Sequence, residues 1–138
     1  MKLKSGFIAK RMLAGIFTAV MIFSLAGCSL LGNSKKTYAN YVTSLLDTNY
    51  KADFTNYMKI TKATEEEAQA VYDDGIDYLA DALMTAYGIK DVEGSDIKDQ
   101  FKALAKDVYS HASYEVSNVT NTDGTYTVTV TIYPIDLL

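Results

Sequence analysis

The residues best suited to act as a nucleophile and a base lie together near position 111. Ser110 and Ser113 flank His111, which is the only histidine in the chain. A serine nucleophile normally needs an imidazole base that a third group orients. Neighbouring side chains on a strand point to opposite faces, which keeps such a pair apart. We therefore expect no catalytic triad, and we interpret His111 as an ordinary residue at a helix end, where a positive imidazole is favourable.

Carboxylates form the second candidate site, because Asp73, Asp77 and Asp81 recur every four residues with Asp74 beside them. On a helix this spacing places the carboxylates in one column, and hard oxygen ligands of this kind suit Ca²⁺. Calcium needs six to eight oxygens, however, and the carbonyls of a helix are already hydrogen-bonded. The acidic loop 91–96 fails the spacing of an EF-hand. We therefore predict a solvated acidic face, no metal site and no cofactor.

Tyrosine is the remaining unusual residue type, with 11 copies in a chain that lacks tryptophan. A tyrosine ring offers a large flat area with a polar tip, which suits both a ligand groove and a protein interface. Several of these residues fall on apolar stripes, and for those we favour burial in the core. The tyrosines considered for a groove or an interface are Tyr38, Tyr41, Tyr50, Tyr57, Tyr114 and Tyr126.

Apolar residues at spacings of three and four predict helices over much of the chain. One amphipathic helix is expected over 38–47, with Asn49 marking its end, and a turn or two of helix over 52–60. Another amphipathic helix is expected over 96–109, with Ser95 as its N-cap. These segments would form the helical layer of a single small domain.

The longest helix is expected over about 65–87. Thr64 and Glu67 match a capping box at its start, and Gly88 can adopt the left-handed conformation just past its end. Gly75 is a weak point inside it, because glycine is a poor helix former. The apolar stripe of this helix is formed by Ala68, Val71, Tyr72, Ile76, Leu79, Leu83 and Tyr87.

The periodicity changes near the C-terminus, where residues 125–132 alternate strictly between threonine and an apolar residue. This pattern predicts a strand with one buried face, and 114–120 predicts a less regular strand joined to it by a turn at 121–124. The expected fold class is α+β, with three to four helices packed on a short C-terminal antiparallel hairpin. Two strands alone leave both edges unpaired, so we expect helices, a partner chain or sequence beyond Leu138 to complete the sheet.

The net charge argues against one class of partner. The whole chain carries −4, with 13 basic and 17 acidic residues, but four of the basic residues precede Cys28 and no acidic residue does. Residues 28–138 therefore have nine lysines, no arginine and a net charge of −8. A polyanion needs clustered cations, and bidentate phosphate recognition favours arginine, so nucleic acid is an unsuitable partner.

The first 27 residues follow the order of a secretory signal, with a basic segment over 1–11 and an uncharged, mostly apolar segment over 12–25. Fourteen helical residues span about 21 Å, which is short of the roughly 30 Å core of a membrane. The segment ends in Leu-Ala-Gly-Cys at 25–28, which resembles the lipobox of bacterial lipoproteins. The resemblance implies cleavage between Gly27 and Cys28 and a diacylglyceryl group on the Cys28 thiol.

This resemblance divides the chain into a signal peptide at 1–27, a lipidated tether at 28–37 and one small domain at 38–138. It implies anchoring at the extracytoplasmic face of the cell membrane, since two acyl chains give stable attachment. The alternative is an ordinary secreted protein in which Cys28 is incidental.

The mature part also resembles uncharacterised lipoproteins of Gram-positive bacteria. The resemblance rests on the lipobox, the segment 51–57, the long acidic helix and a threonine-rich strand that ends at 133–136. It implies a cystatin-like or nuclear-transport-factor-2-like layout, in which a long helix lies across a curved antiparallel sheet. This chain has fewer strands, so its layout would be an incomplete one, and the family has no assigned activity.

Three functions remain in competition. We favour a non-enzymatic binding or interaction module of the cell envelope, with a protein partner or a second copy at the sheet edge. A small-ligand carrier or sensor would need a pocket between the long helix and the sheet. An envelope hydrolase would need paired carboxylates, such as 65–67 or Asp73 with Asp77, with one of them buried and its pKa raised.

Overall fold

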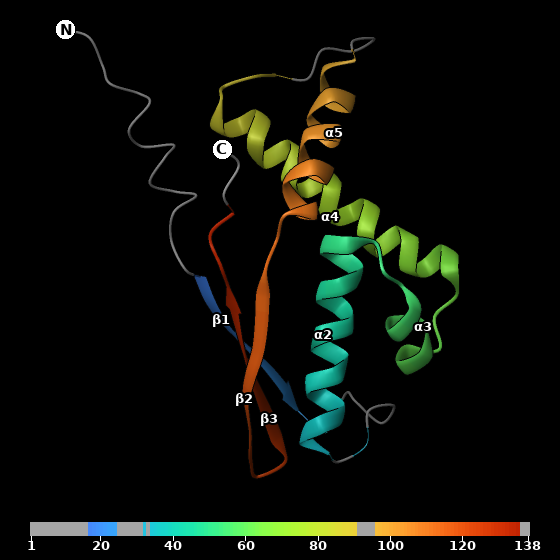
Figure 1. The fold of residues 1–138 in the computed structure, drawn as a ribbon, viewed down its shortest axis with the longest axis vertical. Helices are drawn as coiled ribbons and strands as arrows, with labels where there is room; N and C mark the ends of the chain where they lie inside the picture. The colour runs from blue at the N-terminus through green and yellow to red at the C-terminus, as the bar shows by residue number, and fades with distance from the viewer. Residues whose placement is uncertain (1–16, 25–31, 33, 91–95, 136–138) are drawn as a thin grey trace, which may run out of the picture. The chain divides into compact units, whose positions relative to one another are not determined.

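The computed structural model describes residues 17–24, 32, 34–90 and 96–135, which fall into two compact units. The sheet unit consists of the chain up to Ala39 together with the chain from His111 onward, and the helical unit spans Asn40–Ser110. The described residues contain four helices and an antiparallel hairpin near the C-terminus, and these elements can be followed in Figure 1. These elements confirm the α+β fold class.

The predicted hairpin is present in the sheet unit. Its strands are β2 (Tyr114–Thr122) and β3 (Thr125–Ile132), which pair antiparallel. The two residues between them, Asp123 and Gly124, have φ values of +50° and +80°. Positive φ at both central residues is what a type I′ turn requires, and this turn matches the twist of the strands that it joins.

A third strand, β1 (Phe17–Ser24), pairs antiparallel with the other side of β3, so the order in the sheet is β1-β3-β2. The register runs without interruption from Phe17 opposite Ile132 to Ser24 opposite Thr125. We did not expect this strand, because residues 12–25 were assigned to the apolar part of a signal peptide. Aromatic and β-branched residues in this segment also suit a strand, which explains why one sequence fits both roles.

The outer strand β2 is irregular, as expected, and the irregularity is a bulge. Ser117 lies opposite Thr129 and Thr120 lies opposite Thr127, so β2 has one more residue than β3 over this interval. Asn118 takes a φ of +49° within it. Asparagine is one of the few residues that tolerate this left-handed conformation, which allows the bulge to form.

The strict alternation of β3 produces the predicted buried face. Tyr126, Val128 and Val130 are buried, whereas the threonines between them are only half-buried. The ring of Tyr38 stacks on the ring of Tyr126 with a centroid distance of 4.0 Å and an interplanar angle of 16°. Both rings are almost fully buried, so these tyrosines belong to the core.

Helix α2 (Lys35–Lys51) is longer than the predicted 38–47 at both ends. It begins inside the segment assigned to the tether, at 28–37, and it continues past Asn49. Asn49 does not end the helix. Its side-chain amide donates to the carbonyl of Leu45, so this polar group is hydrogen-bonded within the helix. Helix α3 (Thr55–Thr61) is the expected short helix.

Helix α4 (Glu65–Ala86) has the predicted boundaries. The hydroxyl of Thr64 accepts from the amide of Glu67 at 3.2 Å, and the Glu67 carboxylate accepts from the amide of Thr64 at 2.8 Å. At the other end Gly88 has a φ of +66°, and the amide of Ile89 donates to the carbonyl of Met84. These are the capping box and a Schellman motif, which satisfy backbone groups that a helix end leaves unpaired.

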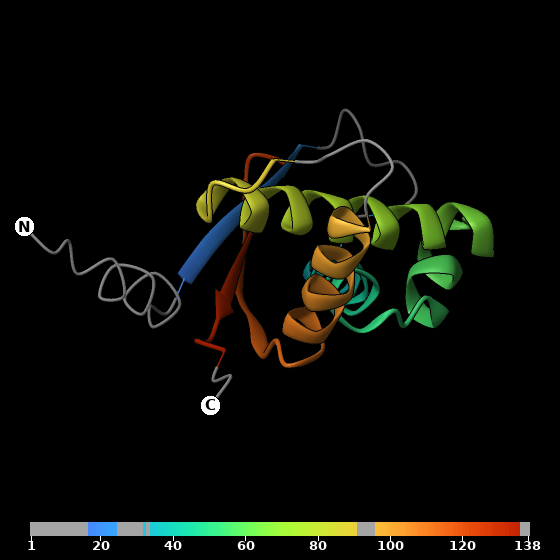
Figure 2. The same cartoon turned by 90° about the horizontal axis from the view of Figure 1, so that it is seen from above.

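Helix α5 (Ile97–Ser110) lies against α4 within the helical unit, as Figure 2 shows. Ile76, Ala80 and Ala105 form the buried centre of their contact. The expected stripe of α4 needs one correction, because Tyr87 is 63% exposed and Ala80 and Met84 are buried instead. The rings and side chains packed around the centre are those of Tyr72, Leu79, Phe101 and Tyr109.

Candidate functional site

The residues assigned to lipidation, Gly27 and Cys28, lie outside the residues that the structure describes. The apolar segment before them is described from Phe17 to Ser24 as strand β1. Within the described part of the chain, no helix has both the length and the apolar character needed to cross a membrane. The lipobox assignment therefore continues to rest on the sequence.

The serine and histidine candidates lie at the C-terminal end of α5 and beyond it. The hydroxyl of Ser110 donates to the carbonyl of Asp107 at 2.7 Å, so it is engaged within its own helix. His111 follows the helix and is exposed, and the carbonyl of Ser113 accepts from the amide of Tyr133. A nucleophile that already donates its proton to a backbone carbonyl is not poised for transfer to an imidazole.

The acidic column of α4 contacts lysines of α5, and this pairing was not predicted from the sequence. Lys102 forms an ion pair with Asp77 at 2.7 Å, and Lys98 forms one with Asp81 at 3.0 Å. The hydrogen bond to Asp77 raises the pKa of Lys102. The third carboxylate, that of Asp73, accepts from the side-chain amide of Gln69. The column thus joins two helices rather than being only a solvated face.

Metal binding has no support in the described residues, since they contain no group of three or more histidine, cysteine, aspartate or glutamate side chains placed to hold an ion. The carboxylates of the column are paired with lysines near the surface. Asp77 and Asp81 keep 45% and 59% of their side-chain surface exposed.

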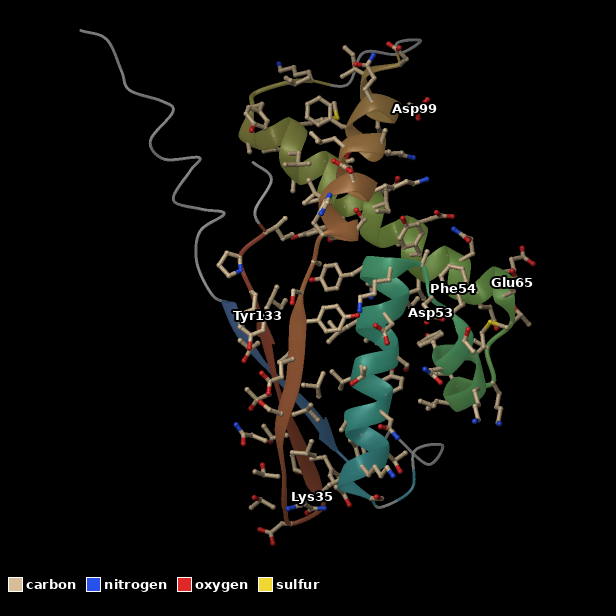
Figure 3. The ribbon with its side chains drawn as sticks, in the orientation of Figure 1. Lys35, Asp53, Phe54, Glu65, Asp99 and Tyr133 are labelled. Carbon is tan, nitrogen blue, oxygen red and sulfur yellow. The ribbon has the colours of Figure 1, made fainter. Side chains whose placement is uncertain are left out.

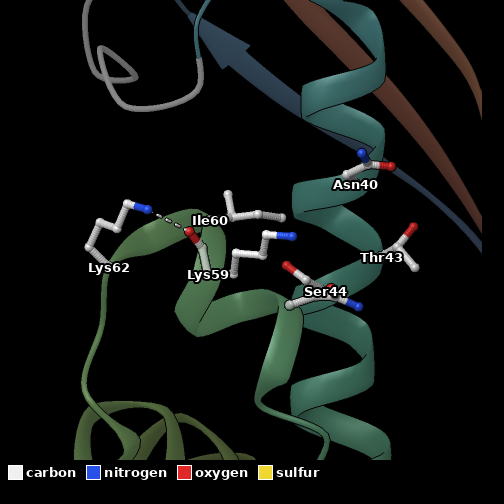
Figure 4. Close-up of a pocket in the computed structure, with 7 residues that line it drawn as sticks. Asn40, Thr43, Ser44, Lys59, Ile60 and Lys62 are labelled. Carbon is white, nitrogen blue, oxygen red and sulfur yellow. Dashed lines mark hydrogen bonds between the residues drawn. The ribbon is translucent and has the colours of Figure 1, made fainter.

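The candidate functional site is a cavity of about 460 Å³ between α2 and α3 (Figure 4). Its volume lies within the range of small-molecule sites in proteins. Lys59 and Lys62 come from α3 and the residue that follows it, and the other side chains are uncharged. The residues that line the cavity are Asn40, Thr43, Ser44, Asn56, Lys59, Ile60 and Lys62.

The local structure of α3 positions the two lysines. The carboxylate of Asp53 accepts from the amide of Thr55 just before the helix, and Lys62 ends it with a left-handed φ of +65°. The ammonium of Lys62 then donates to the carbonyl of Lys59 at 3.1 Å, as the dashed line in Figure 4 shows. This bond holds the ammonium of Lys62 against the C-terminal end of α3.

The lining defines the kind of ligand that the cavity suits. The seven residues named above provide two ammonium groups, two amides and two hydroxyls, and none of them is acidic. Cations bind carboxylate or phosphate oxygens, and amides and hydroxyls can donate to or accept from a sugar-like hydroxyl. The cavity therefore suits a small anion.

This cavity was not predicted from the sequence. Its α2 wall consists of Asn40, Thr43 and Ser44, which recur at spacings of three and four on a helix whose apolar stripe was the feature sought. The signal in the sequence was a polar stripe on α2 beside the apolar one, because the rest of this helix is largely buried. Ser44 is 1% exposed, and its hydroxyl donates to the carbonyl of Tyr41.

The tyrosines divide between the core and the surface. Tyr50 packs edge-to-face against Tyr109 with a centroid distance of 4.7 Å, and burial raises the pKa of both phenols. The most exposed ring is that of Tyr78, at 77%, and it lines a shallow hollow on α4 with Ala82 and Ala86. None of the six tyrosines considered from the sequence lies in this hollow or lines the α2–α3 cavity.

Comparison with known proteins does not assign the chain to a family: no family model, no curated protein and no solved structure matches it.

Proposed function

We propose that the chain is the precursor of a lipoprotein, which is cleaved before Cys28, carries lipid on that residue and presents a non-enzymatic binding domain at the extracytoplasmic face of the membrane. The observation that carries the anchor is the position of the only cysteine. It follows Leu-Ala-Gly at the end of an apolar segment, and a basic N-terminus precedes that segment.

The described residues support a binding role more than a catalytic one. Ser110 is engaged with a backbone carbonyl, and the carboxylates of Asp77 and Asp81 are paired with lysines. A cavity lined by polar and cationic side chains is present instead. Such a cavity can hold a ligand through hydrogen bonds and charge without any group that would transform it.

Fractionation of cells tests the anchor. We expect the wild-type chain to sediment with membranes and to enter a detergent phase, whereas Cys28→Ser loses both properties because no thiol remains to receive lipid. Ser29→Cys in the Cys28→Ser background is the matched control, because it restores a thiol one residue after the predicted lipidation site. Identical fractionation of wild type and Cys28→Ser would contradict the anchor.

A second candidate function is that of a small-ligand carrier, and the two cations of the α2–α3 cavity favour it. The sequence suggested a pocket between the long helix and the sheet, whereas this cavity is lined by α2, α3 and Lys62. Lys59 and Lys62 stand out because the mature chain is strongly acidic, with a net charge of −8 over residues 28–138. A local cationic site in an acidic domain would select an anionic ligand over the cations that the rest of the surface attracts.

A further inference from the structure

Strand β1 lies entirely within the segment that processing before Cys28 would remove. In the full chain it covers one side of β3 along eight residue pairs, from Phe17–Ile132 to Ser24–Thr125. Loss of residues 1–27 therefore turns β3 from a central strand into an edge strand, with a row of unpaired backbone groups. This consequence rests on the proposed function, since it requires the cleavage.

The two outer sides of the β2–β3 hairpin differ in how they are protected. The outer side of β2 has a bulge at Asn118 and a charged residue, Glu115. The Glu115 carboxylate accepts from the hydroxyl of Tyr133, the residue just after β3 that Figure 3 labels. Bulges and charges are the usual means by which edge strands avoid pairing with other chains. The outer side of β2 is therefore suited to remain an edge.

The opposite side of the hairpin, on β3, has none of these features. Residues 125–132 read Thr-Tyr-Thr-Val-Thr-Val-Thr-Ile, without a charge, a glycine or a proline. The register with β1 is continuous over all eight pairs, so the strand is regular and accepts an antiparallel neighbour. An uncharged, regular strand of this composition is a template for pairing when its edge is open.

We infer that, after cleavage, β3 pairs antiparallel with β3 of a second copy of the chain, with Thr129 opposite Thr129 of that copy. This register places Val128 opposite Val130 and Tyr126 opposite Ile132, so the apolar face of one sheet continues into the next. Facing residues of an antiparallel pair project from the same face of the sheet. Only registers that place threonine opposite threonine therefore keep the apolar side chains of both strands on one face. The pair has two-fold symmetry, the commonest symmetry of soluble oligomers.

The second copy is favoured over other occupants for two reasons. In the described residues after Cys28, β3 is the only strand that is both uncharged and regular, because β2 contains Glu115 and the bulge. Two copies anchored in one membrane also meet at a raised effective concentration, which favours an interface between them without any additional contact.

Cysteine cross-linking of the full chain in a host that processes lipoproteins tests the register. Facing residues have Cβ atoms about 4.5–5.5 Å apart, so Thr129→Cys should form a disulfide dimer under mild oxidation. Thr131→Cys is the matched control, because residues 131 of the two copies lie about four residues, or roughly 13 Å, apart along the strand. We expect at least about ten times more dimer from Thr129→Cys, with the band at twice the monomer mass.

Co-expression of Thr127→Cys with Thr131→Cys extends the test, because these positions face one another in the same register. The mixed pair should cross-link, whereas either variant alone should not. Addition of Cys28→Ser to Thr129→Cys should abolish the dimer, because the uncleaved chain keeps β1 on the edge.

Intact mass separates failure of the inference from failure of the proposed function. A processed, lipid-bearing chain in which Thr129→Cys gives no more dimer than Thr131→Cys, or cross-links to a protein of another mass, overturns the second-copy interface and leaves the anchor in place. A chain that retains residues 1–27 in every variant overturns both, because the edge is then never uncovered.

Discussion

The side-chain oxygen of Asn49 lies 2.9 Å from the position that a Cβ atom on Gly75 would occupy. This relationship joins α2 to the middle of α4, and the ring of Tyr109 lies 3.9 Å from the same position. Gly75, which was predicted to be a weak point of the long helix, is therefore the place where another helix approaches. Asn49 is held there by its hydrogen bond to the carbonyl of Leu45.

Gly75→Ala should fail to stabilise the protein. Inside a helix, alanine is about 1 kcal/mol more favourable than glycine for the free energy of folding. The added methyl group, however, displaces Asn49 and breaks its hydrogen bond to Leu45. We expect the free energy of unfolding in urea to stay level or to fall by about 1 kcal/mol. In the Asn49→Ala background the same substitution should raise it, and the absence of this coupling would contradict the close approach.

Tyr126→Ala should destabilise the protein by about 3–5 kcal/mol, the range for truncation of a buried aromatic residue. The reason is that Tyr126 is 3% exposed and stacks on Tyr38. Tyr78→Ala is the matched control, since an exposed ring should cost less than about 1 kcal/mol. Equal losses in urea unfolding would show that the ring of Tyr126 is not in the core.

The stability should decrease at alkaline pH because of the Tyr50–Tyr109 pair. Burial raises the pKa of both phenols in the folded chain, whereas an unfolded tyrosine ionises near pH 10. The folded state thus binds the phenolic proton more tightly, so its contribution is complete below about pH 10 and is lost as pH rises through the folded pKa.

Urea unfolding at pH 8 and at pH 11 measures this loss. In the double variant Tyr50→Phe with Tyr109→Phe the loss should be smaller, because phenylalanine has no proton to release. Tyr87→Phe removes a phenol from an exposed position and is the control for the change in tyrosine number. An undiminished alkaline loss in the double variant would show that these rings do not cause it.

Lys59→Gln combined with Lys62→Gln should weaken binding of inorganic phosphate, the simplest probe of the α2–α3 cavity, by at least about tenfold. Hydrogen bonds to charged groups contribute about 1.5–3 kcal/mol, and 1.4 kcal/mol corresponds to a factor of ten. Lys106→Gln, on the exposed face of α5, removes the same charge elsewhere. Titration followed by amide chemical shifts of Asn40 and Asn56 locates the site, and equal affinities in all variants would exclude the cavity.

The parts of the fold that were predictable from the sequence depend on local interactions. The capping box at Thr64, the left-handed Gly88 and the turn before Thr125 each involve residues within a few positions of one another. Their chemistry therefore determines the local conformation whatever the rest of the chain does.

The features that were missed depend on contacts between distant segments. The pairing of β1 with β3 joins residues more than 100 positions apart, and the cavity needs α3 to lie beside α2. The lysine partners of the α4 carboxylates likewise come from α5. Periodicity reports which side of an element is apolar, but it does not report which element covers that side.

Intact mass of the chain purified from whole cells tests the central claim most directly. If Cys28 is the mature N-terminus, the wild-type chain should lack residues 1–27 and carry the added mass of a diacylglyceryl group, whereas Cys28→Ser should retain the full chain without lipid. A wild-type chain that keeps residues 1–27, or that begins at residue 28 with an unmodified cysteine, would contradict the account.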